Sequence, residues 1–334
     1  MAATYIGDKK KLKFLHKINC IKISIKLECC HATDALNFKA KRRFYLLTDP
    51  SAKYLHDPEK LNSQQISVPV WGVTVLDNEL FVVSMRLPAM LVYDKTSLVR
   101  LRCHEIDQLR QPRDIASIAD KRLLYVVEAG GCPYWIHCVK PNGEFVTKWD
   151  VGSDPRNLSV ANGNEVLVTC NESIKIYTTD GVAIREVRLQ SDEPVVWQAL
   201  HLNTGNYIIC QGFQSVTPYH RVSLLQSDGT LTKWFGGPKG AEADKLFNPY
   251  QIGVDKDQCV LVADTGNNRV RLFTPKLVHV RDLITSEKVT NGNTANESIA
   301  ISRHFLDGKS GRMYIGTNSG HLIVFRVLND QAVA

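Results

Sequence analysis

Side chains suited to binding another molecule recur at one position of a repeated pattern in this sequence. Arg113, Arg156, Trp197 and Tyr250 each follow the residue that opens a strand-like run, and Val70 holds the same place in the first copy. An arginine guanidinium pairs with phosphate or carboxylate as a planar fork, and tryptophan and tyrosine offer flat faces for packing or stacking. The pattern indicates recognition of a ligand.

Signatures of the common catalytic sites are missing from the sequence. It contains no G-x-S-x-G, no H-E-x-x-H, no phosphate-binding loop and no glycine-rich dinucleotide motif, and its 10 His are scattered. We therefore expect a protein that is not an enzyme, with no cofactor, no metal and no small-molecule substrate.

The recognition residues stand on a repeat. Pro69, Pro112 and Pro155 open similar runs at intervals of 43 residues, and further copies begin at Val196, at Pro249 and near residue 297. A period of about 43 residues is typical of a β-propeller with four strands in each blade. We predict an all-β fold, a six-bladed β-propeller of four-stranded antiparallel blades, over residues 41–330.

Short β-rich runs within each copy support this fold class. Residues 80–84, 123–128 and 165–169 are short runs rich in β-branched and aromatic residues, and Asn142-Gly143 and Asp180-Gly181 are dipeptides typical of hairpin turns. The last copy lacks a fourth strand. We expect residues 42–49, RRFYLLTD, to supply it and close the ring; the alternative is a loop. Residues 1–40 are expected to form a basic, disordered N-terminal segment.

One copy carries a sharper motif. Phe247, Pro249, an aliphatic run ending at Asp255 and the stretch VADTGNNRV at 262–270 stand together there. This copy resembles an NHL repeat, as found in the tripartite-motif (TRIM-NHL) proteins. The ubiquitin-ligase modules that precede the propeller in those proteins are not legible here. Asp264 and Arg269 are expected to pair and hold a turn.

The resemblance implies a binding module with a protein or an RNA partner. In a propeller, the first strand of each blade lines the central channel, so the recurring position lies on the rim of one face. The loops between second and third strands reach the same face. The predicted binding residues, with those loops included, are Arg113, Arg156, Trp197, Tyr250, Arg86, Tyr134, Phe213 and Asn268, with Asn171 nearby. The alternative is that the aromatic residues merely cap the channel and that each arginine pairs with a neighbouring carboxylate.

Charge favours a protein partner over RNA. Residues 1–60 hold 13 Lys and Arg against 6 Asp and Glu, which accounts for the whole net charge of +7 and leaves residues 61–334 neutral. Phosphate contacts need clustered Lys and Arg, so a scaffold for protein–protein interaction is the first expectation and single-stranded RNA binding the alternative. A basic patch on the rim face would favour RNA.

The 9 Cys are odd in number and have no framework spacing, which predicts free thiols in a reducing, cytoplasmic compartment. Cys170, Cys210 and Cys259 are expected to be buried. No apolar run reaches the ~20 residues that a membrane span requires, and no secretory signal is visible.

Two metal sites were weighed as alternatives. Zinc-capable side chains gather near the N-terminus without the spacing of a closed site, at His16, Cys20, Cys29, Cys30 and His31. Glu128, Asn171 and Asp264 lie near equivalent second-strand ends, where they could hold Ca²⁺ in a lactonase-like, metal-dependent hydrolase.

Overall fold

A computed structural model of the chain describes residues 49–106, 109–161, 165–190, 195–212, 217–290 and 300–328. The chain divides into two units, Met1–Ala52 and Lys53–Ala334. Of the first, only the turn at residues 49–52 is described, in which the amide of Ala52 donates to the carbonyl of Asp49 at 3.0 Å. The basic segment 1–40 and its boundary lie outside the described residues.

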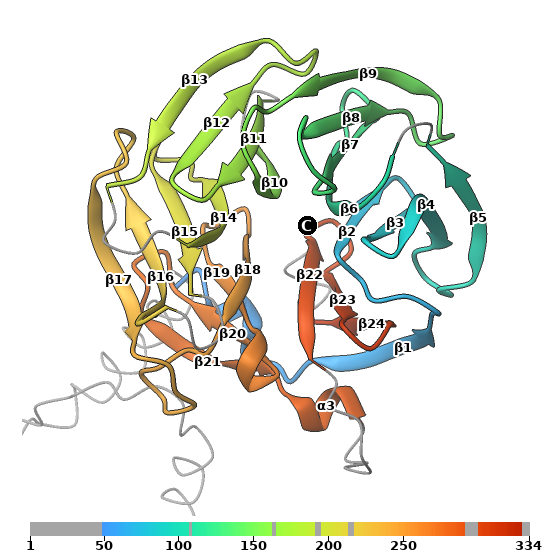
Figure 1. Cartoon of the computed structure of the whole chain (residues 1–334). Coiled ribbons are helices and arrows are strands. Elements are labelled where there is room, and N and C mark those ends of the chain that lie inside the picture. The colour runs from blue at the N-terminus through green and yellow to red at the C-terminus, as the bar shows by residue number, and fades with distance from the viewer. Residues whose placement is uncertain are drawn as a thin grey trace, which may run out of the picture. The chain divides into compact units, whose positions relative to one another are not determined.

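The second unit is a six-bladed β-propeller, which confirms the predicted fold class (Figure 1). Its six antiparallel sheets have four strands each, and in the first five the strands follow one another in chain order from the channel outward. Blade 1 comprises β2 (Gly72–Leu76), β3 (Glu79–Ser84), β4 (Leu87–Asp94) and β5 (Arg100–Glu105), and blade 2 comprises β6 (Pro112–Ile118), β7 (Leu123–Glu128), β8 (Trp135–Val139) and β9 (Phe145–Asp150). Blade 3 comprises β10 (Pro155–Ala161), β11 (Glu165–Cys170), β12 (Ser173–Tyr177) and β13 (Ala183–Arg188), and blade 4 comprises β14 (Val196–His201), β15 (Tyr207–Gln211), β16 (His220–Leu225) and β17 (Leu231–Gly237). Blade 5 comprises β18 (Pro249–Val254), β19 (Val260–Asp264), β20 (Arg269–Phe273) and β21 (His279–Ile284), and blade 6 comprises β22 (Ile301–Asp307), β23 (Arg312–Thr317), β24 (His321–Arg326) and β1 (Glu59–Gln65).

The middle strands are continuous apolar runs because both of their faces are buried. In β3, Leu80 and Val82 pack towards blade 6, whereas Phe81 and Val83 pack towards blade 2. Side chains alternate across a strand, so a strand between two neighbouring blades needs apolar residues at every position. The outermost strands do not need apolar residues at every position, because they are largely exposed: β13 is exposed at five of its six residues.

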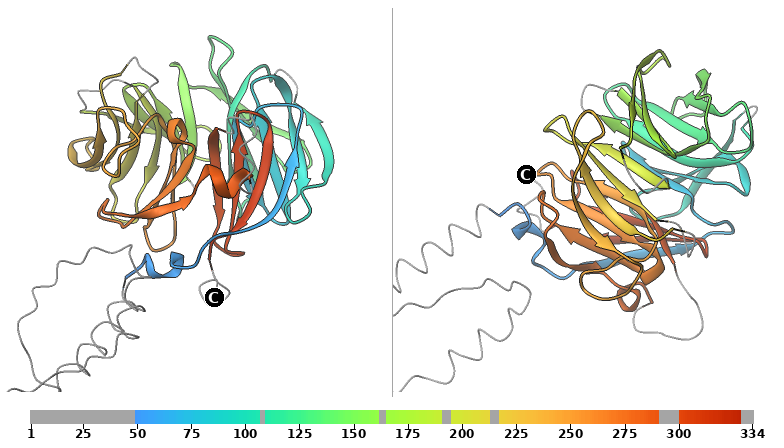
Figure 2. Two further views of the ribbon diagram at one scale, coloured as in Figure 1. Left: turned by 90° about the horizontal axis from the view of Figure 1, so that it is seen from below. Right: turned by 60° about the vertical axis from the view of Figure 1, so that its left-hand side comes forward.

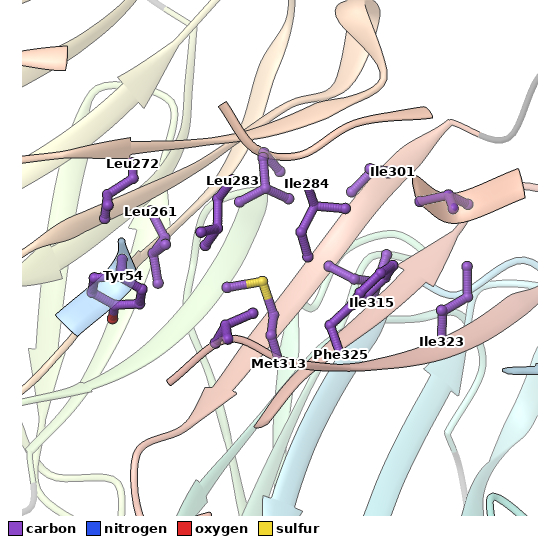
Figure 3. Packing of buried hydrophobic residues seen from close by; sticks show 14 of the residues in the cluster. Tyr54, Leu261, Leu272, Leu283, Ile284, Ile301, Met313, Ile315, Ile323 and Phe325 are labelled. Carbon is purple, nitrogen blue, oxygen red and sulfur yellow. The ribbon is translucent and has the colours of Figure 1, made fainter. Parts of the chain in front are cut away.

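Figure 3 shows one such contact between blades, where blade 5 meets blade 6. Leu261, Leu272 and Leu283 of blade 5 pack against Met313 and Phe325 of blade 6, and all of them are buried. Equivalent clusters lie between every other pair of neighbouring blades. Apolar burial, worth roughly 1.5–3 kcal/mol for each large side chain, therefore holds the ring together blade against blade.

Polar side chains also join neighbouring inner strands. Asp114 accepts a hydrogen bond from the backbone amide of Leu158 at 2.9 Å. Gln198 does the same for Ile252 at 2.7 Å, and Gln251 for His304 at 2.5 Å. Inner strands of different blades share no ladder, so these bonds satisfy amides that face the channel.

The ring is closed by an N-terminal strand, as expected, but the predicted residues were wrong. β1, Glu59–Gln65, pairs antiparallel with β24 from Glu59↔Arg326 to Gln65↔His321. The blue strand in Figures 1 and 2 thus fills the outer edge that we assigned to residues 42–49. Residues 42–48 lie outside the described residues. The sequence of β1, EKLNSQQ, is polar because an outer strand contributes backbone pairing more than buried side chains.

Three short helices complete the described chain: η1 (Ala52–Tyr54), η2 (Thr265–Asn267) and α3 (Ser286–Thr290). The Tyr54 ring is fully buried against blades 5 and 6, and its hydroxyl donates to Asp255 at 2.7 Å. The Lys53 ammonium lies 2.7 Å from the same carboxylate. These contacts anchor the segment that leads into β1.

Cys170, Cys210 and Cys259 are buried free thiols, as predicted. Burial raises the pKa of Cys210 to about 12, which keeps it protonated and unreactive. Of the helices in the described part of the chain, none has the length and apolar character needed to cross a membrane.

Candidate functional site

The recurring sequence position has a structural cause. In blades 2 to 6 the register between the first and second strands shifts at one residue, a β-bulge at Arg113, Arg156, Trp197, Tyr250 and Ser302. A bulge takes a residue out of the ladder and re-aims its side chain. We call these residues, with Trp71 of blade 1, the rim positions.

In blade 1 the sequence alignment was wrong by one residue. Gly72 pairs with Val83 as Asp114 pairs with Val127, so Trp71, not Val70, is equivalent to Arg113. The aliphatic side chain of Val70 is buried in the cluster between blades 6 and 1. Pro69 stands one residue earlier in its blade than Pro112 does in the next, so an alignment that counts from the proline is shifted by one residue in blade 1.

The rim positions surround a cavity of about 520 Å³, here called the rim cavity. It is lined by all six of them, by Arg303 of β22 and by residues from the connections between strands: Pro69, Val70, Met85, Arg86, Asn248, Thr265 and Asn318. Four arginines therefore line the cavity, and none of the described lining residues is acidic. In a propeller body without net charge, this concentrates positive charge in one place.

Asp154 lies beside two of these arginines. Its carboxylate is 3.1 Å from Nη1 of Arg113 and 3.3 Å from Nη2 of Arg156. Arg113 also donates to the carbonyl of Pro155 at 2.6 Å, and Arg156 donates to the side chain of Asn171 at 2.8 Å. Burial is the main cause of a lowered pKa for Arg113. One carboxylate thus partly balances two guanidiniums, and the pairing that we weighed as the alternative is present.

Aromatic rings and guanidiniums stack along the rim. The rings of Trp197 and Tyr250 lie 4.2 Å apart between centroids, and Arg156 lies 5.3 Å from the Trp197 ring. The Trp197 side chain is only 5% exposed, and its indole N–H donates to the carbonyl of Gly212 at 2.7 Å. The faces of these rings are thus largely occupied by other protein groups, which leaves the arginine N–H groups as the main polar contacts for a ligand.

Arg303 was missed in the sequence and is the most deeply placed of the four arginines. It belongs to β22, one residue after the rim position Ser302, and is 1% exposed. Its guanidinium lies 4.4 Å from the Tyr250 ring and 5.8 Å from that of Trp71. Blade 6 begins with Ile301 instead of a proline, so no turn signal marked the copy. Arg86, in contrast, is exposed at the cavity and has no hydrogen bond or ion pair through its guanidinium within the described residues.

Two other predicted binding residues, Tyr134 and Asn268, do not line the rim cavity. Tyr134 packs against the cluster between blades 2 and 3, and its backbone bonds to Asp150 and Val151 beside the outer strand β9. Asn268 takes the left-handed conformation, φ 51°, at the end of η2, so its role is in the turn. Phe213 lies outside the described residues.

Asp264 and Arg269 form the predicted structural pair. The carboxylate of Asp264 is fully buried and accepts from Arg269 Nε at 2.7 Å, from Asn267 at 2.8 Å and from the amide of Phe247 at 2.7 Å. Burial raises the pKa of Asp264, and these three bonds offset part of that effect. The pair ties the loop before β18 to the turn between β19 and β20.

The candidate calcium ligands are each engaged elsewhere. Glu128 lies 3.1 Å from the buried ring of His137, Asn171 binds Arg156 and Asp264 binds Arg269. The described residues contain no group of three or more His, Cys, Asp or Glu side chains placed to hold a metal ion. The candidate zinc residues at 16–31 lie outside the described residues.

No protein-family model and no curated protein matches this chain. Solved structures match its fold. A protein of unknown function from Bacteroides caccae has a TM-score of 0.55 at 12% identity, over 71% of this chain and 81% of its own. The hydrazine synthase of Kuenenia stuttgartiensis has a TM-score of 0.56 at 11% identity, over 80% of this chain and 98% of its own. Virginiamycin B lyase from Staphylococcus aureus has a TM-score of 0.55 at 10% identity, over 80% and 99% respectively. At these identities the likeness shows the β-propeller fold alone, and the NHL resemblance stays a prediction.

Proposed function

We propose that this propeller is a non-catalytic binding module that recruits a protein partner through the rim cavity. The observation that carries the proposal is the lining: four arginines and three aromatic rings meet in one hollow, and no described acidic residue lines it. Arginine, tryptophan and tyrosine are the residues enriched among interface hot spots. A volume of about 520 Å³ accommodates one or two side chains of a partner.

Single-stranded RNA is the second candidate, and the four arginines favour it. Two features weigh against it. Sequence-tolerant RNA binding uses open aromatic faces on which bases stack, whereas Trp197 is buried against Tyr250. The four arginines also line a single hollow, whereas a bound strand needs a basic groove that follows its backbone.

Pull-down from a lysate, with and without ribonuclease, followed by affinity measurement on the recovered partner, tests the proposal. Arg113→Ala and Arg156→Ala should each weaken binding by about thirtyfold, which corresponds to about 2 kcal/mol for a hot spot. Arg188→Ala, an exposed arginine on the outer strand β13, is the matched control and should change nothing. Trp197→Phe tests the ring with less disturbance of packing than Trp197→Ala.

Three outcomes are informative. A partner that survives ribonuclease and loses affinity with both rim substitutions supports the proposal. A partner lost on ribonuclease treatment, whose affinity falls steeply with salt, replaces it with RNA binding. Unchanged affinity in every rim variant that still melts like the parent overturns the rim cavity as the binding site.

A further inference from the structure

Arg303 is a buried cation without an ion-pair partner. Its side chain is 1% exposed, it forms no ion pair within the described residues, and the buried carboxylate of Asp114 acts on it only from beyond ion-pair distance. Removing a charged side chain from water costs several kcal/mol unless another charge or a full set of hydrogen bonds compensates. The rings of Tyr250 and Trp71 supply cation–π contacts, which offset only part of this cost.

The hydrogen bonds of this guanidinium are also incomplete. Nε donates to the carbonyl of Trp71, and Nη1 donates to the carbonyl of Ser302 at 3.1 Å. Nη2 is buried and has no partner among the described residues. Nε of Arg113, another residue of the same cavity wall, is likewise buried and without a partner there. Two guanidiniums of one cavity thus hold donors that the described protein leaves unused.

The rest of the lining is equally short of negative charge. Asp154 pairs with Arg113 and Arg156, but no acidic residue approaches Arg86 or Arg303 within ion-pair distance in the described part of the chain. The hydroxyl of Ser302 donates to the carbonyls of Val70 and Gly316, and the amide side chains of Asn248 and Asn318 complete the polar wall. These amides are donors as well as acceptors, so they tolerate an anion.

We infer that the rim cavity is an oxyanion site, in which Arg303 anchors a carboxylate or phosphate group of the ligand and Arg113 and Arg86 assist. A guanidinium presents paired N–H groups that match the oxygens of either group. A bound oxyanion would supply the ion-pair partner that Arg303 lacks within the described residues. This inference rests on the proposed function only in taking the cavity as the ligand site, and it names the chemical group that the partner must present.

The test measures the melting temperature of the full chain against increasing sodium acetate and, separately, inorganic phosphate, at constant ionic strength. Phosphate stabilises many proteins by exclusion from their surface. The informative quantity is therefore the difference between the rise in melting temperature of the parent and that of Arg303→Met. We expect a saturable rise for the parent, none for Arg303→Met, and an unchanged rise for the surface control Arg188→Met. The arm with the lower apparent Kd identifies the preferred group.

Arg303→Lys is a second variant in case Arg303→Met does not fold. Lysine keeps the positive charge but lacks the paired N–H groups of the guanidinium, so the apparent Kd for the anion should rise about tenfold, or 1.4 kcal/mol. Equal rises in the parent and in both Arg303 variants would overturn the inference. Its failure is distinguishable from failure of the proposed function. If the protein binds the anion but rim substitutions leave partner affinity unchanged, only the proposed function is refuted. If rim substitutions weaken partner binding but the protein does not bind the anion through Arg303, only the inference is refuted.

Discussion

Asp114 allows a quantitative test of the channel's electrostatics. Its carboxylate is buried beside the inner strands, accepts hydrogen bonds from the backbone amides of Leu158 and Ile115, and interacts with the more distant charge of Arg303. Burial raises its pKa from 3.8 to about 6. The folded protein therefore binds a proton there that the unfolded chain has released, and the free energy of unfolding falls as the pH rises through this interval.

The magnitude follows from the size of the shift. Each pKa unit is worth 1.36 kcal/mol, so between about pH 4.5 and about pH 7.5 the parent should lose about 2 kcal/mol of stability through Asp114. Asp114→Asn keeps an oxygen acceptor but does not titrate. The stability of this variant relative to the parent should therefore increase by about 2 kcal/mol over the same interval.

Urea denaturation of both proteins at the two pH values measures this difference, because other titrating groups are common to both and cancel. Asp94→Asn is the control. Hydrogen bonds from Ser97 lower the pKa of Asp94 below 3.8, so its relative stability should stay constant above about pH 4.5. If the Asp114→Asn difference were equally constant, the burial argument for Asp114 would be refuted.

Three further predictions concern the scaffold. Deleting residues 1–66 should lower the melting temperature far more than deleting 1–48, since only the longer cut removes β1 and uncovers β24; equal losses in two melting curves would contradict the closing role of β1. Asp264→Ala should cost about 2–3 kcal/mol in urea denaturation, because Nε of Arg269 and the amide of Phe247 lose their acceptor while Asp282 still pairs with Arg269; a loss below about 1 kcal/mol would mean that water replaces the carboxylate. A bulky thiol reagent should modify the exposed Cys132 rapidly and leave Cys210 unmodified until denaturant is added; rapid labelling of Cys210 would place it outside the core.

The fold was predictable because strands that are buried on both faces need apolar residues at successive positions, and such runs are visible in the sequence. Runs such as Val166–Val168 in residues 165–170 are apolar on both faces of the strand, and they recur at the blade period. β1 was not predictable by the same means: its residues EKLNSQQ are polar, since its pairing with β24 uses backbone groups that every residue has. For that reason, the closing strand was predicted at the more apolar residues 42–49.

The candidate site was partly predictable for a related reason. The bulge that re-aims Arg113 and Arg156 follows a proline, and the proline is visible in the sequence. Blade 6 begins with Ile301 and lacks that signal, and the importance of Arg303 comes from its missing ion pair and its unused donor. Which charges lack a partner depends on distances between blades, and one sequence does not contain them.

The closing strand has a consequence for how the chain folds during synthesis. Glu59 pairs with Arg326, so the pairing partners are separated by nearly the entire length of the propeller. Blades 1 to 5 are each built from consecutive strands and can form as they leave the ribosome, but the ring cannot close until β24 has emerged. Until then, β1 has no partner strand, and after β24 emerges its edge stays unpaired until β1 joins it; such unpaired edges are where chains associate wrongly. The step most exposed to aggregation, and most in need of a chaperone, is therefore the last one, and it depends on a strand made among the first.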